Sequence, residues 1–288
     1  MIPPATAILQ VAEPVVPLAP DWNQRLAAAK AVMAAAEVRR FDKLKGAPLS
    51  DWVRKRAAEQ GAKFSSEALR LLVNLAGNDL RLAAAWAEMA ASLPTPRAIV
   101  AISAHWYINA TAVTSMAVPR VIHDFYGFPQ ELFDFDYPAP GSPDLARQVA
   151  AIAQPEIVHL DDETWGIDHG TWSVLAKMYP AADVPVVQLA IDASKPLSYH
   201  MDLGARLAPL LDDDVLIVGS GNVVHNLRMV AWDREAQGYD WAQRFDDDVR
   251  RIMTTHPDRL SDAASSDDFY LAVPTPDHFY PLAYIAGL

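Results

Sequence analysis

The stretch IVAISAHWY, residues 99–107, decides the fold prediction, because an apolar run is followed at once by polar and aromatic residues. Such a run predicts a buried strand and places His105 at the strand's end. Similar runs follow at residues 110–116, 184–191 and 215–220, and helical stretches lie at 143–153, 170–179, 196–211, 240–255 and 276–286. Strands that alternate with helices predict an α/β domain with a mostly parallel or mixed central sheet flanked by helices.

The first part of the chain has a different composition. Residues 1–85 contain 12 basic and 8 acidic side chains, a net charge of +4, whereas residues 86–288 contain 12 and 28, a net charge of −16. Strong helix formers and capping residues dominate the first part, so we predict a small, mainly helical segment ahead of the sheet. We therefore expect two parts, residues 1–82 and residues 83–288.

The composition narrows the chemistry. The 288 residues include no cysteine, which excludes disulfides, cysteine-ligated zinc and thiol catalysis and fits a reducing cytoplasm. No apolar run approaches the roughly 20 residues that cross a bilayer, and the N-terminus lacks the basic start of a signal peptide. We expect a cytoplasmic protein without a membrane segment, and the acidic charge of its larger part argues against nucleic acid as a partner.

Four histidines follow strand ends or occur in unusual contexts. They are His105, His169 in GIDHGTW, His225 in SGNVVHNLR and His278 in PTPDHFYPL. The carboxyl ends of parallel strands lie along one edge of a sheet, so these residues can meet there. Neutral imidazoles bind Fe(II) or Zn(II) and can leave coordination positions open. Each histidine can also be an ordinary hydrogen-bonded structural residue, so the pattern permits a metal site without requiring one.

The remaining histidines need no special role in this interpretation. His123 can hydrogen-bond its own loop, whereas His159, His200 and His256 have helix-surface or loop-surface contexts. The long loop at residues 123–143 is rich in aromatic residues and proline. Its aromatic side chains either form core or line a pocket for a flat apolar substrate.

Residues 86–288 also resemble the class III extradiol ring-cleaving dioxygenases, in the DODA-type or 4,5-DOPA dioxygenase-like branch. The stretches that carry the resemblance occur in the family's order: AWAEMAASLPTPRAIVAISAHWY, IHDFYGFPQELFDFDYPAPGSP, WGIDHGTWSVLAKMYP, PVVQLAID, GSGNVVHNLR and PTPDHFYPLAYIAG. The resemblance implies a single non-haem Fe(II), or Zn(II) as in some relatives. It also implies cleavage of a small aromatic diol next to its two hydroxyls, with both atoms of O₂ inserted.

The resemblance assigns a role to each of the four histidines. It implies that His105 and His278 are metal ligands, and that His225 is the general acid/base or a further ligand. His169 would line the pocket and hydrogen-bond the substrate or bound oxygen. The family normally has another ligand histidine after a first strand, but no histidine precedes His105 here, and Glu13 is not favoured as its substitute. We therefore expect a domain without the usual first strand and C-terminal end, and possible impairment of its activity.

Residues 7–82 resemble the lid region of the DNA polymerase III delta subunit, a clamp-loader component. The resemblance rests on FDKLKGAPLSDWVRKRAAEQGAKFSSEALRLLVNLAGNDLRLAA. It implies a clamp-loader-type partner for residues 1–82. It also leaves an alternative function open, in which the chain is a non-catalytic chimeric or binding protein.

Overall fold

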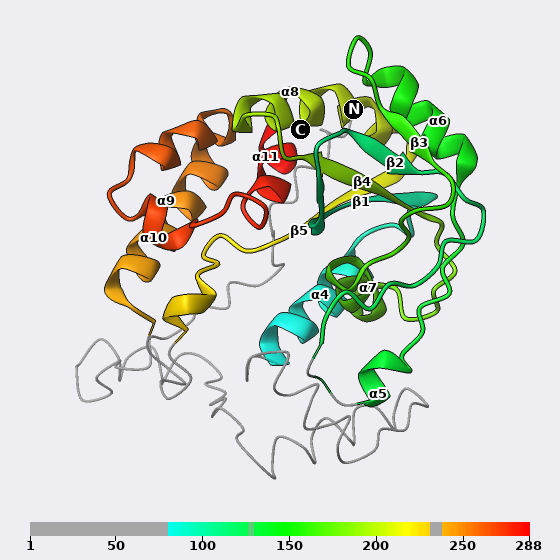
Figure 1. Cartoon of the computed structure of the whole chain (residues 1–288), viewed down its shortest axis with the longest axis horizontal. Helices are drawn as coiled ribbons and strands as arrows, with labels where there is room; N and C mark the ends of the chain where they lie inside the picture. Colours follow the sequence, from blue (N-terminus) through cyan, green and yellow to red (C-terminus); the bar gives the residue numbers. More distant parts are fainter. Residues whose placement is uncertain (1–79, 127, 129, 231–237) are drawn as a thin grey trace, which may run out of the picture. The chain divides into compact units, whose positions relative to one another are not determined.

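The computed structural model describes residues 80–126, 128, 130–230 and 238–288 (Figure 1). The predicted helical segment lies outside these residues, apart from the start of α4 (Leu80–Ser92). The clamp-loader-like stretch and Glu13 also lie outside them, so the expectations attached to that segment stay predictions.

In the described part of the chain, a mixed sheet forms the centre of the fold. Its strands are β1 (Ala98–Ile108), β2 (Ala112–Thr114), β3 (His159–Asp161), β4 (Val186–Asp192) and β5 (Val215–Ser220), in the order β3-β2-β4-β1-β5. The central strand β1 is parallel to both β4 and β5, whereas β2 is parallel to β3 and antiparallel to β4. This arrangement confirms the predicted α/β fold.

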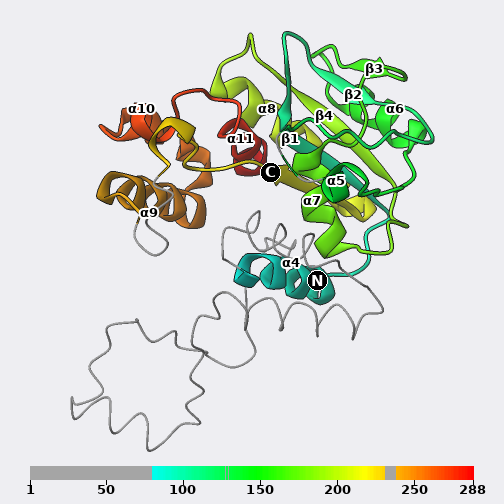
Figure 2. The same ribbon diagram turned by 60° about the horizontal axis from the view of Figure 1, so that its bottom comes forward.

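Helices cover both faces of the sheet (Figures 1 and 2). On β1, Val100 and Ile102 pack into a core with α6 (Pro143–Ile152), α8 (Leu197–Leu207) and α11 (Tyr280–Gly287). The alternate residues Ile99 and Ala101 pack with α4 and α7 (His169–Met178) on the other face. Successive strand side chains point to opposite faces, so burial on both sides explains why the central strands read as continuous apolar runs.

A third core lies beside α11. Helices α9 (Asp240–Thr255) and α10 (Phe269–Ala272) and the 3₁₀ segment η3 (Pro257–Ser265) pack around Phe245 and Phe279, each 1% exposed. The smaller elements are α5 (Gln130–Phe133), η1 (Ala208–Asp213) and η2 (Leu227–Met229). Among the helices that the structure describes, none combines the length and apolar character that a membrane crossing requires.

The predicted helices mostly hold, with two corrections. The stretch predicted as one helix at 196–211 divides into α8 and η1, where Pro209 lies in the first turn of η1. The last helix begins at Tyr280 and not near residue 276, and Pro281 lies in its first turn, where a missing N–H leaves no helical hydrogen bond unmade. His278 therefore lies just before α11.

Strand β1 extends further than predicted. Its pairing with β4 is regular up to Ile102, becomes irregular, and resumes at Tyr107. The apolar pattern stops at Ser103, which is why the sequence indicated an earlier end. His105 thus lies inside the strand, in a stretch where the register shifts, and irregularities of this kind turn side chains away from the usual alternation.

Candidate active site

The structure brings the four predicted histidines together. His105 lies on β1, His169 begins α7, His225 lies in the loop after β5, and His278 precedes α11. The ring centres of His105 and His169 are 4.0 Å apart, those of His105 and His278 are 5.3 Å apart, and those of His225 and His278 are 3.4 Å apart. Their proximity agrees with the prediction, while the role of each side chain stays a hypothesis.

A glycine allows α7 to approach β1 closely. A Cβ atom on Gly170 would lie 2.5 Å from Ser103 Oγ and 2.8 Å from His105 Cδ2. The hydroxyl of Ser220, at the end of β5, donates a hydrogen bond of 2.6 Å to the carbonyl of Gly170. The start of α7 is thereby held against two neighbouring strands, which places His169 beside His105.

A buried polar network fixes the same turn to the sheet. Asp168 caps α7 by accepting a 3.0 Å hydrogen bond from the backbone N–H of Thr171. Gln188 on β4 donates its amide to the Asp168 carboxylate, and its carbonyl accepts the Asp168 backbone N–H at 3.2 Å. Asp168 and Gln188 are both fully buried, and buried polar groups are stable only when they are paired in this way.

Backbone contacts join the segments that carry His225 and His278. The N–H of Asn222 donates to the carbonyl of His278 at 2.9 Å, and the N–H of His225 donates to the carbonyl of Ala272 at 2.8 Å. A Cβ atom on Gly221 would lie only 2.2 Å from the His278 carbonyl oxygen, so glycine is required for this approach.

The Asp277 carboxylate accepts a hydrogen bond from the ring nitrogen Nδ1 of His278. Burial raises the pKa of the Asp277 carboxyl, but the hydrogen bonds from His278 and Thr275 outweigh it and lower that pKa to about 2. Burial is the main cause that lowers the pKa of His225, and the nearby His278 ring adds to this. Asp277 is therefore a carboxylate near neutral pH, beside an imidazole that donates to it.

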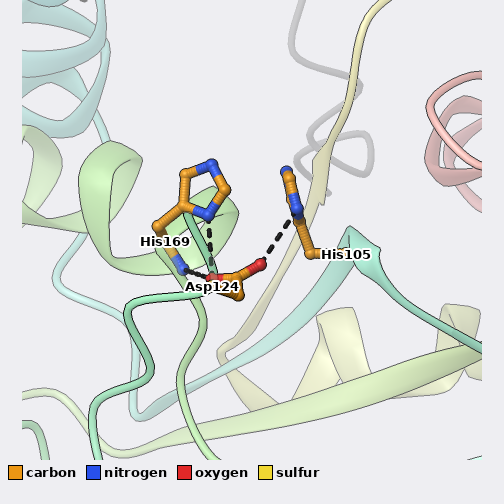
Figure 3. A group of neighbouring side chains, drawn as sticks. All are labelled: His105, Asp124 and His169. Atoms are coloured by element: carbon orange, nitrogen blue, oxygen red, sulfur yellow. Dashed lines mark hydrogen bonds and ion pairs between the residues drawn. The ribbon is translucent and has the colours of Figure 1, made fainter. Parts of the chain in front are cut away.

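Asp124 is the principal site residue that sequence reasoning missed. Its carboxylate lies 3.0 Å from His105 Nδ1 and 2.8 Å from His169 Nδ1, and it accepts the His169 backbone N–H at 3.0 Å (Figure 3). Burial is the largest single effect and lowers the pKa of His105, but the hydrogen bond to Asp124 and the negative charges of Asp124, Asp168 and Asp277 together outweigh it and leave that pKa raised. Burial raises the pKa of Asp124, but its hydrogen bonds from the two histidines hold it well below the usual range.

Among the described residues, two groups of side chains place ligand atoms within 4.8 Å of one another. One is His105, Asp124 and His169, and the other is His225, Asp277 and His278. The predicted metal set of His105, His225 and His278 is thus divided between them, although the His105 and His278 rings are neighbours. Imidazole nitrogen and carboxylate oxygen are suitable donors for Fe(II) or Zn(II), so the residues present fit such an ion.

Some aromatic residues near the site belong to the hydrophobic core, and others lie beside the site histidines. Trp106 and Tyr137 are almost fully buried, at 3% and 2% exposed, and belong to the core. Phe125 meets the His169 ring edge to face, with ring centres 5.3 Å apart, and packs on Phe133 at 4.9 Å. Tyr126 is 90% exposed. Phe125 is therefore the aromatic side chain of this loop that contacts a predicted site histidine.

The other histidines mostly match their predicted contexts. The ring of His123 hydrogen-bonds the carbonyl of Phe135 at 2.8 Å, as expected for a loop-stabilising residue, and His159 and His256 are exposed. His200 is a correction, because it is fully buried on the inner face of α8, where its Nδ1 lies 3.1 Å from the Tyr284 hydroxyl.

Comparison with known proteins identifies the family of the chain. Residues 74–287 match the family described as the catalytic LigB subunit of aromatic ring-opening dioxygenase. The chain belongs to this family. It is 48% identical over 208 residues to an Escherichia coli protein named 4,5-DOPA dioxygenase extradiol, which covers 70% of this chain and 76% of that relative. A Beta vulgaris protein of the same name is 38% identical over 199 residues, covering 67% of this chain and 73% of the relative.

A solved structure is also similar to the chain. The crystal structure of an uncharacterized Escherichia coli K12 protein matches with a TM-score of 0.62 and 43% sequence identity, over 71% of this chain and 80% of that protein. The family match covers residues 74–287, and so includes all four histidines of the site and Asp124.

Proposed function

We propose that this protein is a metal-dependent extradiol dioxygenase that opens the ring of a catechol-type substrate with O₂. The observation that carries the proposal is the cluster of four imidazoles around His105, in a chain of the ring-opening dioxygenase family. The metal would be Fe(II), or Zn(II) as found in some relatives, since both accept imidazole nitrogen.

The ring spacings favour His105 and His278 as the residues that hold the ion. Two imidazoles bound to one ion through nitrogens at about 2.1 Å have ring centres roughly 5 Å apart. The His105 and His278 centres, at 5.3 Å, match this spacing. The His225 and His278 rings are stacked at 3.4 Å, which is too close for that geometry, so we assign His225 to acid–base chemistry beside the ion.

When bound, the ion would supply positive charge and open positions for the two catechol oxygens and O₂. The protein's own side chains do the rest. His225 is placed to take a proton from a catechol hydroxyl and to return one later, as an imidazole does near neutral pH. His169 would accept a hydrogen bond from a substrate hydroxyl through Nε2, and Phe125 would limit the space beside His169.

The substrate class follows from the relatives. Proteins of the family that are named 4,5-DOPA dioxygenase share 48% and 38% identity with this chain, so we propose a 3,4-dihydroxyphenyl compound with a small side chain. In the overall reaction, the ring carbon–carbon bond next to the diol breaks and both oxygen atoms of O₂ enter the product. DOPA is the first compound to test, with protocatechuate and catechol as smaller diols.

The test combines metal analysis with oxygen uptake. The full chain, loaded anaerobically with Fe(II), should consume O₂ when DOPA or another of these diols is added. A ring-opened product should form, and its absorbance spectrum should differ from that of the diol. Absence of both bound metal and oxygen uptake with all three diols would refute the enzyme assignment.

Matched variants locate the site. His105→Ala and His278→Ala should each lose metal and activity, whereas His225→Ala should retain metal and lose turnover. His159→Ala, which removes an exposed histidine away from the cluster, is the control and should leave both unchanged. Retention of full activity by the His105 or His278 variant would contradict the assignment of ligands.

A further inference from the structure

Asp124 makes an unusual set of contacts for a loop residue. Each of its carboxylate oxygens faces a different imidazole, with Oδ2 at 3.0 Å from His105 Nδ1 and Oδ1 at 2.8 Å from His169 Nδ1. Oδ1 also accepts the backbone N–H of His169. The Asp124 side chain is 17% exposed, so water competes little for these bonds. One carboxylate thus connects two histidines that come from β1 and from α7.

These contacts define where each ring carries its proton. An ionised carboxylate only accepts hydrogen bonds, so a neutral histidine that bonds to it must carry hydrogen on the contacting nitrogen. Both His105 and His169 contact Asp124 through Nδ1, which leaves Nε2 of each ring as the lone-pair nitrogen. Figure 3 shows both Nε2 atoms on the side of the rings away from Asp124. A metal ligand must present such a lone pair.

We propose that Asp124 is a positioning residue that sets the same tautomer on His105 and His169, so that both rings direct Nε2 away from it. For His105 the consequence is a lone pair presented to the ion, and for His169 it is an acceptor presented to the substrate side. These two consequences rest on the proposed function, whereas the tautomers themselves do not. Hydrogen-bonded carboxylates of this kind also hold the ring orientation of ligand histidines in other metal sites.

A competing role for Asp124 is direct ligation. Its carboxylate, with the two histidines, also fits the spacing of a three-residue ligand group. That role requires lone pairs on the two Nδ1 atoms and hydrogen on Nε2, because the same nitrogen cannot both donate to Asp124 and bind an ion. The two roles therefore predict opposite tautomers for His105 and His169, and this difference can be measured.

The first measurement needs no metal. In apo protein labelled with ¹⁵N-histidine, long-range ¹H–¹⁵N spectra at about pH 9, well above the ordinary pKa of a histidine, distinguish the tautomers. We expect hydrogen on Nδ1 of both rings, assigned by comparison with His105→Gln and His169→Gln.

Asp124→Asn should move at least one ring to the other tautomer, because its amide nitrogen is a donor. Asp134→Asn, a change at an exposed aspartate on a nearby segment, should change neither. Hydrogen on Nε2 of both rings in the unmodified protein, or unchanged tautomers in Asp124→Asn, would overturn the proposal.

The second measurement is metal affinity, by competition between the protein and a chromophoric chelator for Zn(II). Loss of a residue that hydrogen-bonds a metal ligand typically weakens metal binding by about 10–100-fold, so Asp124→Asn should bind Zn(II) more weakly than the unmodified protein by a factor in that range. The thermal unfolding of the variant should stay cooperative. Affinity equal to that of the unmodified protein would overturn the positioning role. If the unmodified chain holds no metal while its tautomers depend on Asp124, the proposed function fails and the tautomer assignment stands.

Discussion

Replacing His200 with phenylalanine should make the protein less sensitive to acid. His200 is fully buried between α8 and α11, and its ring lies against Tyr280 and Tyr284, with ring centres 4.5 and 5.2 Å apart. Burial lowers its pKa to about 4, although the charge of Asp192 opposes this. Among the described residues, its Nε2 is a buried atom without a hydrogen-bond partner, so the folded protein holds the ring neutral.

The size of the effect follows from the two pKa values of His200. An unfolded histidine has a pKa of about 6.5, so between pH 6.5 and about 4 the unfolded chain binds more protons than the folded one. Stability is then fully present above pH 6.5 and falls as the pH drops through this window. The full difference is about 3 kcal/mol, and roughly 2 kcal/mol of it is lost between pH 7 and pH 5.

Urea unfolding at pH 7 and at pH 5 measures this loss. From pH 7 to pH 5 the unmodified protein should lose about 2 kcal/mol more of its unfolding free energy than His200→Phe. The variant also loses the hydrogen bond to Tyr284, which costs about 1 kcal/mol at either pH and cancels in the comparison. His159→Gln, at an exposed position, is the control and should behave like the unmodified protein. Equal losses in His200→Phe and the unmodified protein would refute the reasoning.

Three further changes test the site and the core. Gly170→Ala places a methyl group 2.8 Å from His105 Cδ2, and the resulting displacement should lower the rate of oxygen uptake by about 100-fold; an unchanged rate would show that the close approach is unimportant. Asp277→Asn, which alters the partner of His278, should weaken Zn(II) binding by about 10–100-fold in chelator competition, and equal affinity would contradict this role. Leu145→Ala, at a fully buried core position, should destabilise the protein by about 3 kcal/mol in urea without altering the activity of folded molecules.

The strands that the sequence predicted well are those buried on both faces. All seven residues of β4 are buried, and all of them except Gln188 and Asp192 are apolar, which is a strong signal at this length. The three-residue strand β3 was missed because His159 and Leu160 are exposed and Asp161 is polar, so no apolar pattern marks it. Its position comes from pairing with β2, which is a tertiary contact and leaves no local signal.

The candidate site residues that lie on or directly after sheet strands could be predicted from the sequence. The one that lies on a loop could not, because its position depends on the path of that loop. His105 and His225 lie on or after parallel neighbours, β1 and β5, so a shared edge could be inferred. Asp124 reaches the site because its loop is held by the bridge between Val121 and Ile167, a pairing without a sequence pattern.

The prediction that His200 lies on the surface was wrong, and the sequence pattern of α8 could have corrected it. The buried residues of α8 are His200, Leu203, Gly204 and Leu207, and this spacing of three and four residues defines one helix face. The apolar members alone indicated the face that packs inward, and the position of residue 200 on it predicted burial whatever its polarity. The polar residue type was given more weight than its position on the helix.

The arrangement also explains how a small set of imidazoles can suit this chemistry. No histidine precedes His105 in the sequence, so every imidazole available to the site lies in the described part of the chain. Binding both catechol oxygens and O₂ requires open coordination positions, which favours few protein ligands but weakens the hold on the ion. A carboxylate that accepts the Nδ1 hydrogen makes an imidazole more basic at Nε2 and fixes its orientation. Asp124 on His105 and Asp277 on His278 are placed to do this for both proposed ligands, so we expect the metal affinity to depend on the two carboxylates as well as on the rings.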